Sequence, residues 1–81
     1  MAPRSPAHAA LGRAIARVRG RREMSQEELA ARAGMDRTFV GGIERGEENP
    51  SFDKLLRLAR VLGLRPSELV AAAEQDERRN S

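Results

Sequence analysis

Residues 25–46 decide the fold, and they read Ser-Gln-Glu-Glu-Leu-Ala-Ala-Arg-Ala-Gly-Met-Asp-Arg-Thr-Phe-Val-Gly-Gly-Ile-Glu-Arg-Gly. Ser25 followed by Glu28 is a capping-box pattern, in which the hydroxyl accepts from a backbone N–H and the carboxylate reaches back. A helix therefore begins at Ser25 and stops at Gly34, a residue that tolerates the left-handed conformation just past a helix end. Asp36 is a good N-cap for a second helix.

Three further helical stretches flank this pair. The one before it covers about residues 7–22, with apolar side chains recurring on one face at Leu11, Ile15 and Val18. The next follows a cap at Ser51 and ends at Gly63. Pro66 suits the first turn of the last helix.

The composition agrees with a small helical domain. The chain has 81 residues, of which 40% are hydrophobic, 33% charged and only 2% aromatic, which disfavours a β-sandwich or barrel built on aromatic pairs. We predict an all-α five-helix bundle in which residues 8–75 form the domain. Residues 1–7 are predicted to be a flexible N-terminus, and residues 76–81 a flexible charged tail.

Several classes of function are disfavoured by what the sequence lacks. It contains no cysteine and a single histidine, His8, so no thiolate or imidazole cluster is available for a metal, a cofactor or acid–base catalysis. We therefore predict no enzyme activity and no bound metal or cofactor. No apolar run is long enough to span a bilayer and no leader is recognisable, so we expect a cytoplasmic protein without a membrane partner.

Positive charge is concentrated in the first half of the chain. The formal net charge is +3, and residues 1–46 carry nine arginines against five acidic residues, whereas residues 47–81 carry six basic against seven acidic residues. Two interpretations explain this bias equally well: a solvated arginine-rich surface, or a surface that binds a polyanion. If the chain binds a polyanion, its first half is the expected site.

The central helix pair has the spacing of a helix-turn-helix. Gly34, Met35 and Asp36 form a three-residue turn, and Val40 and Ile43 supply the inward face of the second helix. Two polar side chains at the start of that helix, Arg37 and Thr38, face the other way. Such an edge can enter a major groove and present hydrogen-bonding groups to bases.

These residues resemble the Cro/C1-type (XRE) helix-turn-helix DNA-binding domains, which have a lambda-repressor-like fold. The resemblance covers about residues 11–70 and rests on segments that agree in order and spacing: residues 25–30, 34–38, 43–46, 49–51 and 55–63. Within the family, residues 36–45 are most similar to the controller proteins of restriction-modification systems, which are homodimeric regulators. The sequence departs from the family pattern in two ways: Glu23 replaces a usual glycine, and Glu47 and Glu48 place carboxylates beside the expected phosphate path.

The resemblance implies that the third helix reads DNA. Arg37 and Thr38 would contact bases, since a guanidinium fits the two acceptors of guanine, and Gln26 would touch a phosphate or a base edge at the margin. Phe39 either packs on a base or sugar or folds back as partial core. Two glycines inside the helix, Gly41 and Gly42, either let it sit deep in the groove or are merely tolerated.

The resemblance also implies one structural ion pair and a set of phosphate contacts. Arg19 and Glu44 would form a mostly buried ion pair that fixes the third helix. Phosphates would be held by five groups: the side chains of Arg17, Arg45, Asn49 and Ser51, and the backbone N–H of Phe52.

A single module is too small to be selective, so we predict a homodimer on a two-fold symmetric operator in double-stranded DNA. Four apolar residues of the last segment form the expected dimer seam, unless they only close the monomer core: Leu64, Leu69, Val70 and Ala73. The alternative function is an antitoxin or adapter whose bundle binds mainly another protein. Candidate protein partners on either hypothesis are a toxin and RNA polymerase.

Overall fold

The computed structural model describes residues 2–80, and these form five α-helices without a strand. In chain order the helices are α1 (Pro6–Arg21), α2 (Gln26–Ala33), α3 (Arg37–Glu44), α4 (Phe52–Val61) and α5 (Pro66–Arg79). This confirms the predicted all-α five-helix architecture. Within the described range, no helix is long and apolar enough to cross a membrane.

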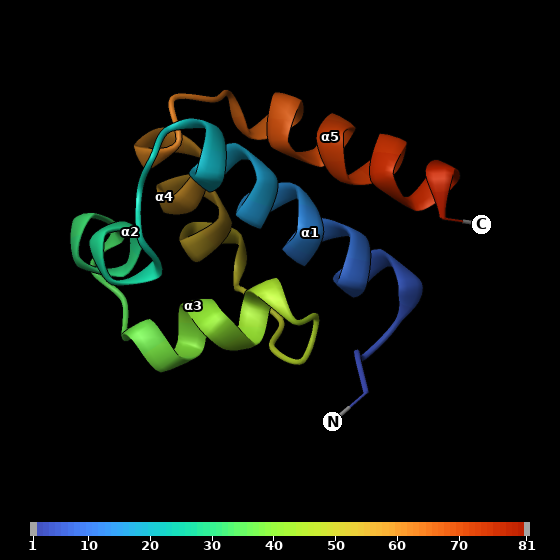
Figure 1. Cartoon of the computed structure of the whole chain (residues 1–81), viewed down its shortest axis with the longest axis horizontal. Helices are drawn as coiled ribbons and strands as arrows, with labels where there is room; N and C mark the ends of the chain where they lie inside the picture. Colours follow the sequence, from blue (N-terminus) through green and yellow to red (C-terminus); the bar gives the residue numbers. More distant parts are fainter. Residues whose placement is uncertain (1, 81) are drawn as a thin grey trace.

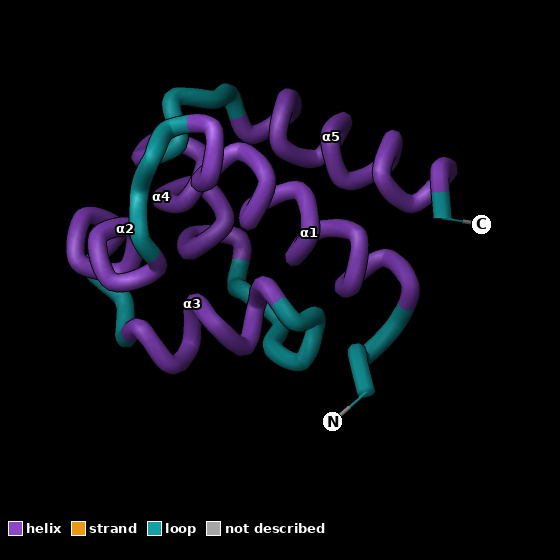
Figure 2. Tube along the Cα trace, viewed as in Figure 1, coloured by secondary structure: helices purple, strands orange, loops and turns teal. Residues whose placement is uncertain are grey.

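Helix α1 runs through the middle of the molecule (Figure 1), with α5 lying antiparallel along one side of it and α3 crossing on the other. Helix α2 packs against α3 and α4, and α4 also contacts α5. The connections between helices are short loops (Figure 2), so that each helix turns sharply into the next. As a result α3 lies at one edge of the bundle, opposite α5.

Every helix contributes to one apolar core. Seven large side chains have less than 2% of their surface exposed: Ile15, Leu29, Val40, Ile43, Leu58, Leu62 and Leu69. Each helix supplies at least one of them, and the pairs Val40/Ile43 and Leu58/Leu62 have the i, i+3 and i, i+4 spacing of one helix face, with Leu62 just after α4. The core therefore fixes which face of each helix points outward.

The predicted N-caps are present. The Ser25 hydroxyl accepts from the N–H of Glu28 at 3.0 Å, the Asp36 carboxylate from Thr38 at 2.8 Å, and the Ser51 hydroxyl from Lys54 at 3.2 Å. The return bond expected of Glu28 is not formed, because its carboxylate lies 3.7 Å from the guanidinium of Arg32 instead. Only the hydroxyl half of that capping box is realised.

Helix α1 ends in a backbone conformation that side chains disfavour. Glu23 has a φ of 54°, its N–H donates to the carbonyl of Gly20, and the next N–H, that of Met24, donates to Arg19. This is the Schellman pattern, and a glycine supplies the left-handed residue where the same pattern ends α2, α3 and α4. Glu23, which stands where the resemblance leads us to expect glycine, is thus a position at which a Cβ is strained.

We expect Glu23→Gly to stabilise the protein. Left-handed backbone costs a residue with a Cβ about 1–2 kcal/mol, and the greater freedom of glycine in the unfolded chain offsets part of the gain. The expected net gain is about 0.5–1 kcal/mol, which corresponds to a melting temperature roughly 4 °C higher. Glu23→Ala is the control, because it removes the carboxylate but keeps the Cβ. An equal gain in both variants would show that charge, not backbone strain, is responsible.

The terminal helices extend beyond the predicted domain bounds on both sides. Helix α1 already begins at Pro6, with Ser5 capping it through the N–H of His8, and the N–H of Arg4 donates to the carbonyl of Gly46 at 2.8 Å. Helix α5 runs on to Arg79 instead of giving way to a charged tail. Met1 and Ser81, the extremes of the two predicted flexible segments, lie outside the described residues.

A buried carboxylate explains why α5 continues. Asp76 is 5% exposed and accepts from Arg13 Nε at 2.5 Å and from Arg17 Nη1 at 3.0 Å, both on α1. Burial alone raises the pKa of the Asp76 carboxyl, but the hydrogen bonds and charges of the two arginines outweigh it, so the pKa lies below its usual range. The segment that looks like a solvated tail is therefore tied to α1.

This arrangement predicts acid sensitivity. The folded-state pKa of Asp76 is depressed, so its contribution to stability is complete above the unfolded value of about 3.9 and is lost as the pH falls through the lower folded value. Asp76→Asn should lower the urea midpoint at neutral pH and flatten its decline in acid. Glu77→Gln, the loss of an exposed carboxylate next along α5, should leave the decline as in the wild type. Identical profiles for the two variants would contradict the assignment.

Candidate nucleic-acid interface

The edge helix α3 has one buried and one open face. Val40 and Ile43 are 0% and 1% exposed and point into the core, while Arg37 and Thr38 are exposed at the start of the helix. The turn before it is made by Gly34, whose φ is 69°. The structure therefore brings together the features of a helix-turn-helix: a tight turn, an anchored inner face and polar side chains on the outer edge.

The ion pair expected to fix α3 is present. Arg19 Nε donates to Glu44 Oε2 at 2.7 Å and Arg19 Nη2 to Glu44 Oε1 at 3.0 Å, and the two side chains are 20% and 7% exposed. The hydrogen bond to Glu44 raises the pKa of Arg19, outweighing burial, which lowers it. Arg19 Nη1 also donates to the carbonyl of Met24 at 2.9 Å, so the pair joins α1, its following turn and α3.

Gln26 belongs to the same network. Its Nε2 donates to Glu44 Oε1 at 2.7 Å. This places the first residue of α2 directly beside the last residue of α3. The sequence pattern contains no sign of this bond, because the two residues are 18 positions apart and neither side chain is unusual for a helix surface.

The two glycines of α3 are not equivalent. A Cβ on Gly41 would lie 3.2 Å from Arg45 Nη1 and 3.8 Å from Gln26 Oε1, so two polar side chains meet over its bare backbone. A Cβ on Gly42 would lie only 2.5 Å from Glu48 Cγ. Gly42 is thus covered by the loop after α3 and is not available to a deep groove contact, and Gly41 is buried beneath the side chains of Arg45 and Gln26.

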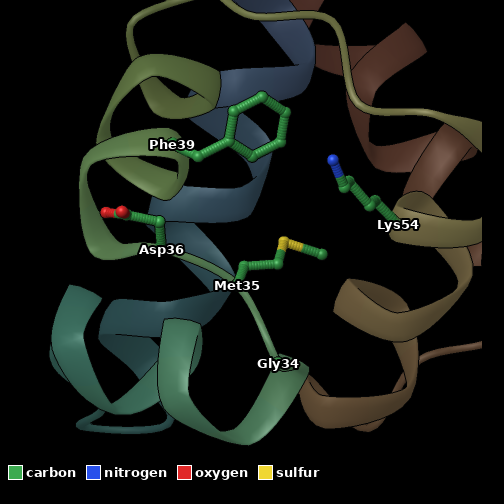
Figure 3. Close-up of a pocket in the computed structure, with 5 residues that line it drawn as sticks. All are labelled: Gly34, Met35, Asp36, Phe39 and Lys54. Carbon is green, nitrogen blue, oxygen red and sulfur yellow. The ribbon is translucent and has the colours of Figure 1, made fainter.

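Phe39 folds back toward the bundle, which is the second of its two expected positions. Its half-buried ring packs against the core and lies 4.5 Å from the ammonium nitrogen of Lys54. The ring, the Met35 thioether and Lys54 face one another around a pocket of about 300 Å³ between the turn and α4 (Figure 3), while the Asp36 carboxylate points away from it. In this structure Phe39 does not join the polar edge of α3.

The remaining predicted contacts surround the loop between α3 and α4. Arg45 is 59% exposed and pairs with Glu47 at 3.2 Å, and Asn49 Oδ1 lies 3.2 Å from His8 Nε2. The Ser51 hydroxyl caps α4, and Phe52, the first residue of that helix, is 75% exposed. These groups sit within one largely exposed stretch of eight residues, 45–52, that follows the polar edge of α3, and their contacts with phosphate stay predictions.

Arg17 does not belong to this surface. Its guanidinium donates to Asp76 of α5, and α5 and α3 lie on opposite sides of α1 (Figure 1). The expected phosphate contact is therefore replaced by an ion pair, because the buried Asp76 carboxylate requires a counter-charge.

The predicted dimer seam is divided by the structure. Leu69 is 0% exposed and belongs to the monomer core, so its assignment to an interface is wrong: it lies on the α5 face that packs inward. Leu64 and Ala73 are half-buried, and only Val70 is largely open, at 43% exposure. Leu64, Val70 and Ala73 stay candidates for contact with a second copy.

The sequence analysis did not identify Gly12, whose lack of a side chain lets α3 approach α1 closely. A Cβ on Gly12 would collide with the backbone carbonyl oxygens of Ile43 and Glu44, so the end of α3 rests directly on the backbone of α1. A glycine within an otherwise strong helical pattern was the available signal. In the described part of the chain, no cluster of three or more histidine, cysteine or acidic residues is arranged to hold a metal ion.

Comparison with known proteins gives one consistent result. A helix-turn-helix family model matches residues 15–69. The transcriptional regulator y4dJ of Sinorhizobium fredii is 35% identical over 65 residues, which cover 80% of this chain and 84% of that protein. Control protein C.BamHI of Bacillus amyloliquefaciens is 35% identical over 60 residues, covering 73% of this chain and 74% of that protein.

A solved structure agrees. The restriction-modification controller protein C.AhdI from Aeromonas hydrophila is 40% identical and superposes with a TM-score of 0.75, over 76% of this chain and 94% of that one. These relatives are regulators of transcription or controller proteins, and the family model spans the helices that build the polar edge of α3. The chain therefore belongs to the Cro/C1-type (XRE) helix-turn-helix family of DNA-binding transcription regulators.

Proposed function

We propose that this chain is a sequence-specific regulator that acts as a homodimer on a two-fold symmetric operator, with α3 in the major groove. The observation that carries the proposal is the edge of α3. Arg37 and Thr38 are exposed on a helix whose opposite face is fully buried, so they project from a rigid support. Rigid presentation of a guanidinium fork is what bidentate recognition of guanine requires.

The surroundings of α3 suit a phosphate backbone. Arg45 and Asn49 lie in the stretch that follows the helix, and Ser51 opens α4, whose first N–H groups favour an anion. The ion pair between Arg45 and Glu47 opposes phosphate binding by Arg45, because the carboxylate competes with phosphate for the same guanidinium. We therefore expect moderate affinity with pronounced dependence on ionic strength.

Dimerisation follows from size. One short helix reads only a few base pairs, and two modules related by a two-fold axis double the contacts on half-sites about one helical turn, roughly 34 Å, apart. Val70 is the large apolar residue of α5 that is exposed and available for such contact, with the half-buried Leu64 and Ala73 near it in the sequence. Leu69 is excluded from it.

Sedimentation combined with a salt titration tests the proposal. We expect two protomers on each duplex that carries a selected operator, and an affinity that falls with salt by a slope of about 0.9 per neutralised phosphate on a double-logarithmic plot. Val70→Glu should give one protomer per duplex at much lower affinity, while Glu74→Gln, another exposed site on α5, should change neither property. A salt-independent interaction, or none with DNA, would favour the antitoxin or adapter function.

A further inference from the structure

The network around Glu44 fixes the orientation of the Gln26 side chain. Both oxygens of the Glu44 carboxylate accept from Arg19, and Oε1 accepts from Gln26 as well. A carboxylate paired with a guanidinium only accepts hydrogen bonds, so the Gln26 atom facing it must be the donor, Nε2. The amide cannot turn over without placing its oxygen against an anion.

The other edge of the amide lies over Gly41, on the side of α3 where a Cβ of that residue would project. Gln26 Oε1 lies 3.8 Å from the position that a Cβ on Gly41 would occupy, so it covers this buried glycine, which follows the exposed Arg37 by one helical turn. Nε2 retains a second hydrogen after its bond to Glu44. Gln26 therefore offers an acceptor and a donor side by side next to the reading edge, on a half-buried side chain whose rotation is restricted.

This pattern fits one base. In the major groove adenine presents a donor at N6 next to an acceptor at N7, which a glutamine amide satisfies through Oε1 and Nε2 together. A phosphate presents only acceptors and would use Nε2 alone, leaving Oε1 turned toward a negatively charged group. The fixed amide is therefore better suited to an adenine than to the backbone.

We propose that Gln26 reads an adenine in each half-site and that Glu44 is the positioning residue that locks its amide for this contact. The inference rests on the proposed entry of α3 into the major groove. It assigns Glu44 a second role beyond its ion pair with Arg19, because the same carboxylate that anchors α3 also sets the specificity of the neighbouring helix.

The experiment measures the preference of the protein for each base at every position of a selected operator. Gln26→Ala should abolish an adenine preference of about tenfold at one position per half-site and leave the other positions unchanged. At that adenine, 7-deazaadenine, which lacks the N7 acceptor, should weaken binding of the wild type but not of Gln26→Ala. A loss that is uniform over all sequences, and insensitive to 7-deazaadenine, would overturn the proposal and identify a phosphate contact.

Glu44→Gln distinguishes two roles of residue 44: orienting the Gln26 amide and anchoring α3. An amide at residue 44 can pair with either orientation of the Gln26 amide. In the folded variant, the adenine preference should fall while the preference at the base read by Arg37 persists. Loss of both preferences together would show that Glu44 acts only as scaffold. If this variant does not fold, the 7-deazaadenine comparison still decides whether Gln26 reads adenine. A wild-type protein that selects no operator at all would instead refute the proposed function itself.

Discussion

Gly12→Ala is expected to destabilise the protein by about 3 kcal/mol, the upper end of the usual cost of overpacking. The added methyl group would collide with the carbonyl oxygens of Ile43 and Glu44, which are backbone atoms and cannot rotate away. For a domain of this size the melting temperature should fall by roughly 15 °C. Thermal denaturation followed by circular dichroism measures the change.

Gly20→Ala is the matched control, because it makes the same substitution in the same helix. Apart from its chain neighbours and the adjacent backbone of α1, no atom lies within 4 Å of the Cβ it would add, and the residue is exposed. Alanine at a helical position is favoured over glycine by about 0.5–1 kcal/mol, so this variant should melt at a higher temperature than the wild type. Equal melting temperatures for the two variants would contradict the close approach of α3 to α1.

The second large effect is expected at Arg37. Arg37→Ala should cost about 1–3 kcal/mol in operator affinity, or roughly 5- to 150-fold per half-site, and remove the base preference at one position in each half-site. The physical reason is that the guanidinium is exposed on the rigid edge of α3 and fits the two acceptors of guanine. Competition binding with operators substituted at each position measures the loss.

Arg22→Ala controls for charge, since it removes one arginine that lies outside α3. Arg22 follows α1 and lies beside Gly63, next to the turn between α4 and α5. It should reduce affinity slightly and equally for all sequences. If Arg22→Ala and Arg37→Ala have the same effect, then Arg37 contributes net charge and does not read a base.

Local signals in the sequence were sufficient for most of the architecture. Ser25, Asp36 and Ser51 each cap the helix that follows them, and Pro66 is the first residue of α5. These residues act on backbone groups within a few positions, which makes their effects readable without knowledge of the fold. The order of the helices and the inward face of α3 were predicted for the same reason.

The errors come from interactions between distant parts of the chain. Asp76 is polar and lies in a charged segment, yet it is buried because Arg13 and Arg17, 63 and 59 residues away, neutralise it. Leu69 was assigned to a dimer seam because helical periodicity does not reveal whether an apolar face is covered within the monomer or by a second copy. The role of Gly12 is not predictable from local sequence, because the end of α3, which packs against it, is remote in sequence.

The roles assigned to Arg37, Thr38 and the loop after α3 stay predictions, since they concern contacts with DNA. Their exposure and grouping agree with those roles, whereas Arg17 and Phe39 are engaged elsewhere in the bundle. Phe39 shows why such roles are hard to predict from sequence. A ring at the margin of a helix can pack outward or inward, and here it packs inward, beside Lys54 and Met35.

Methylation interference on an operator selected from random duplexes tests the central claim most directly, because methylation of guanine N7 blocks the major groove alone. We predict that methylation interferes with binding at guanines in two symmetric half-sites about ten base pairs apart. Arg37→Ala should abolish the interference at one guanine in each half-site, while Arg22→Ala should abolish it at none. Selection of a site at which guanine N7 methylation has no effect would contradict the placement of α3 in the major groove.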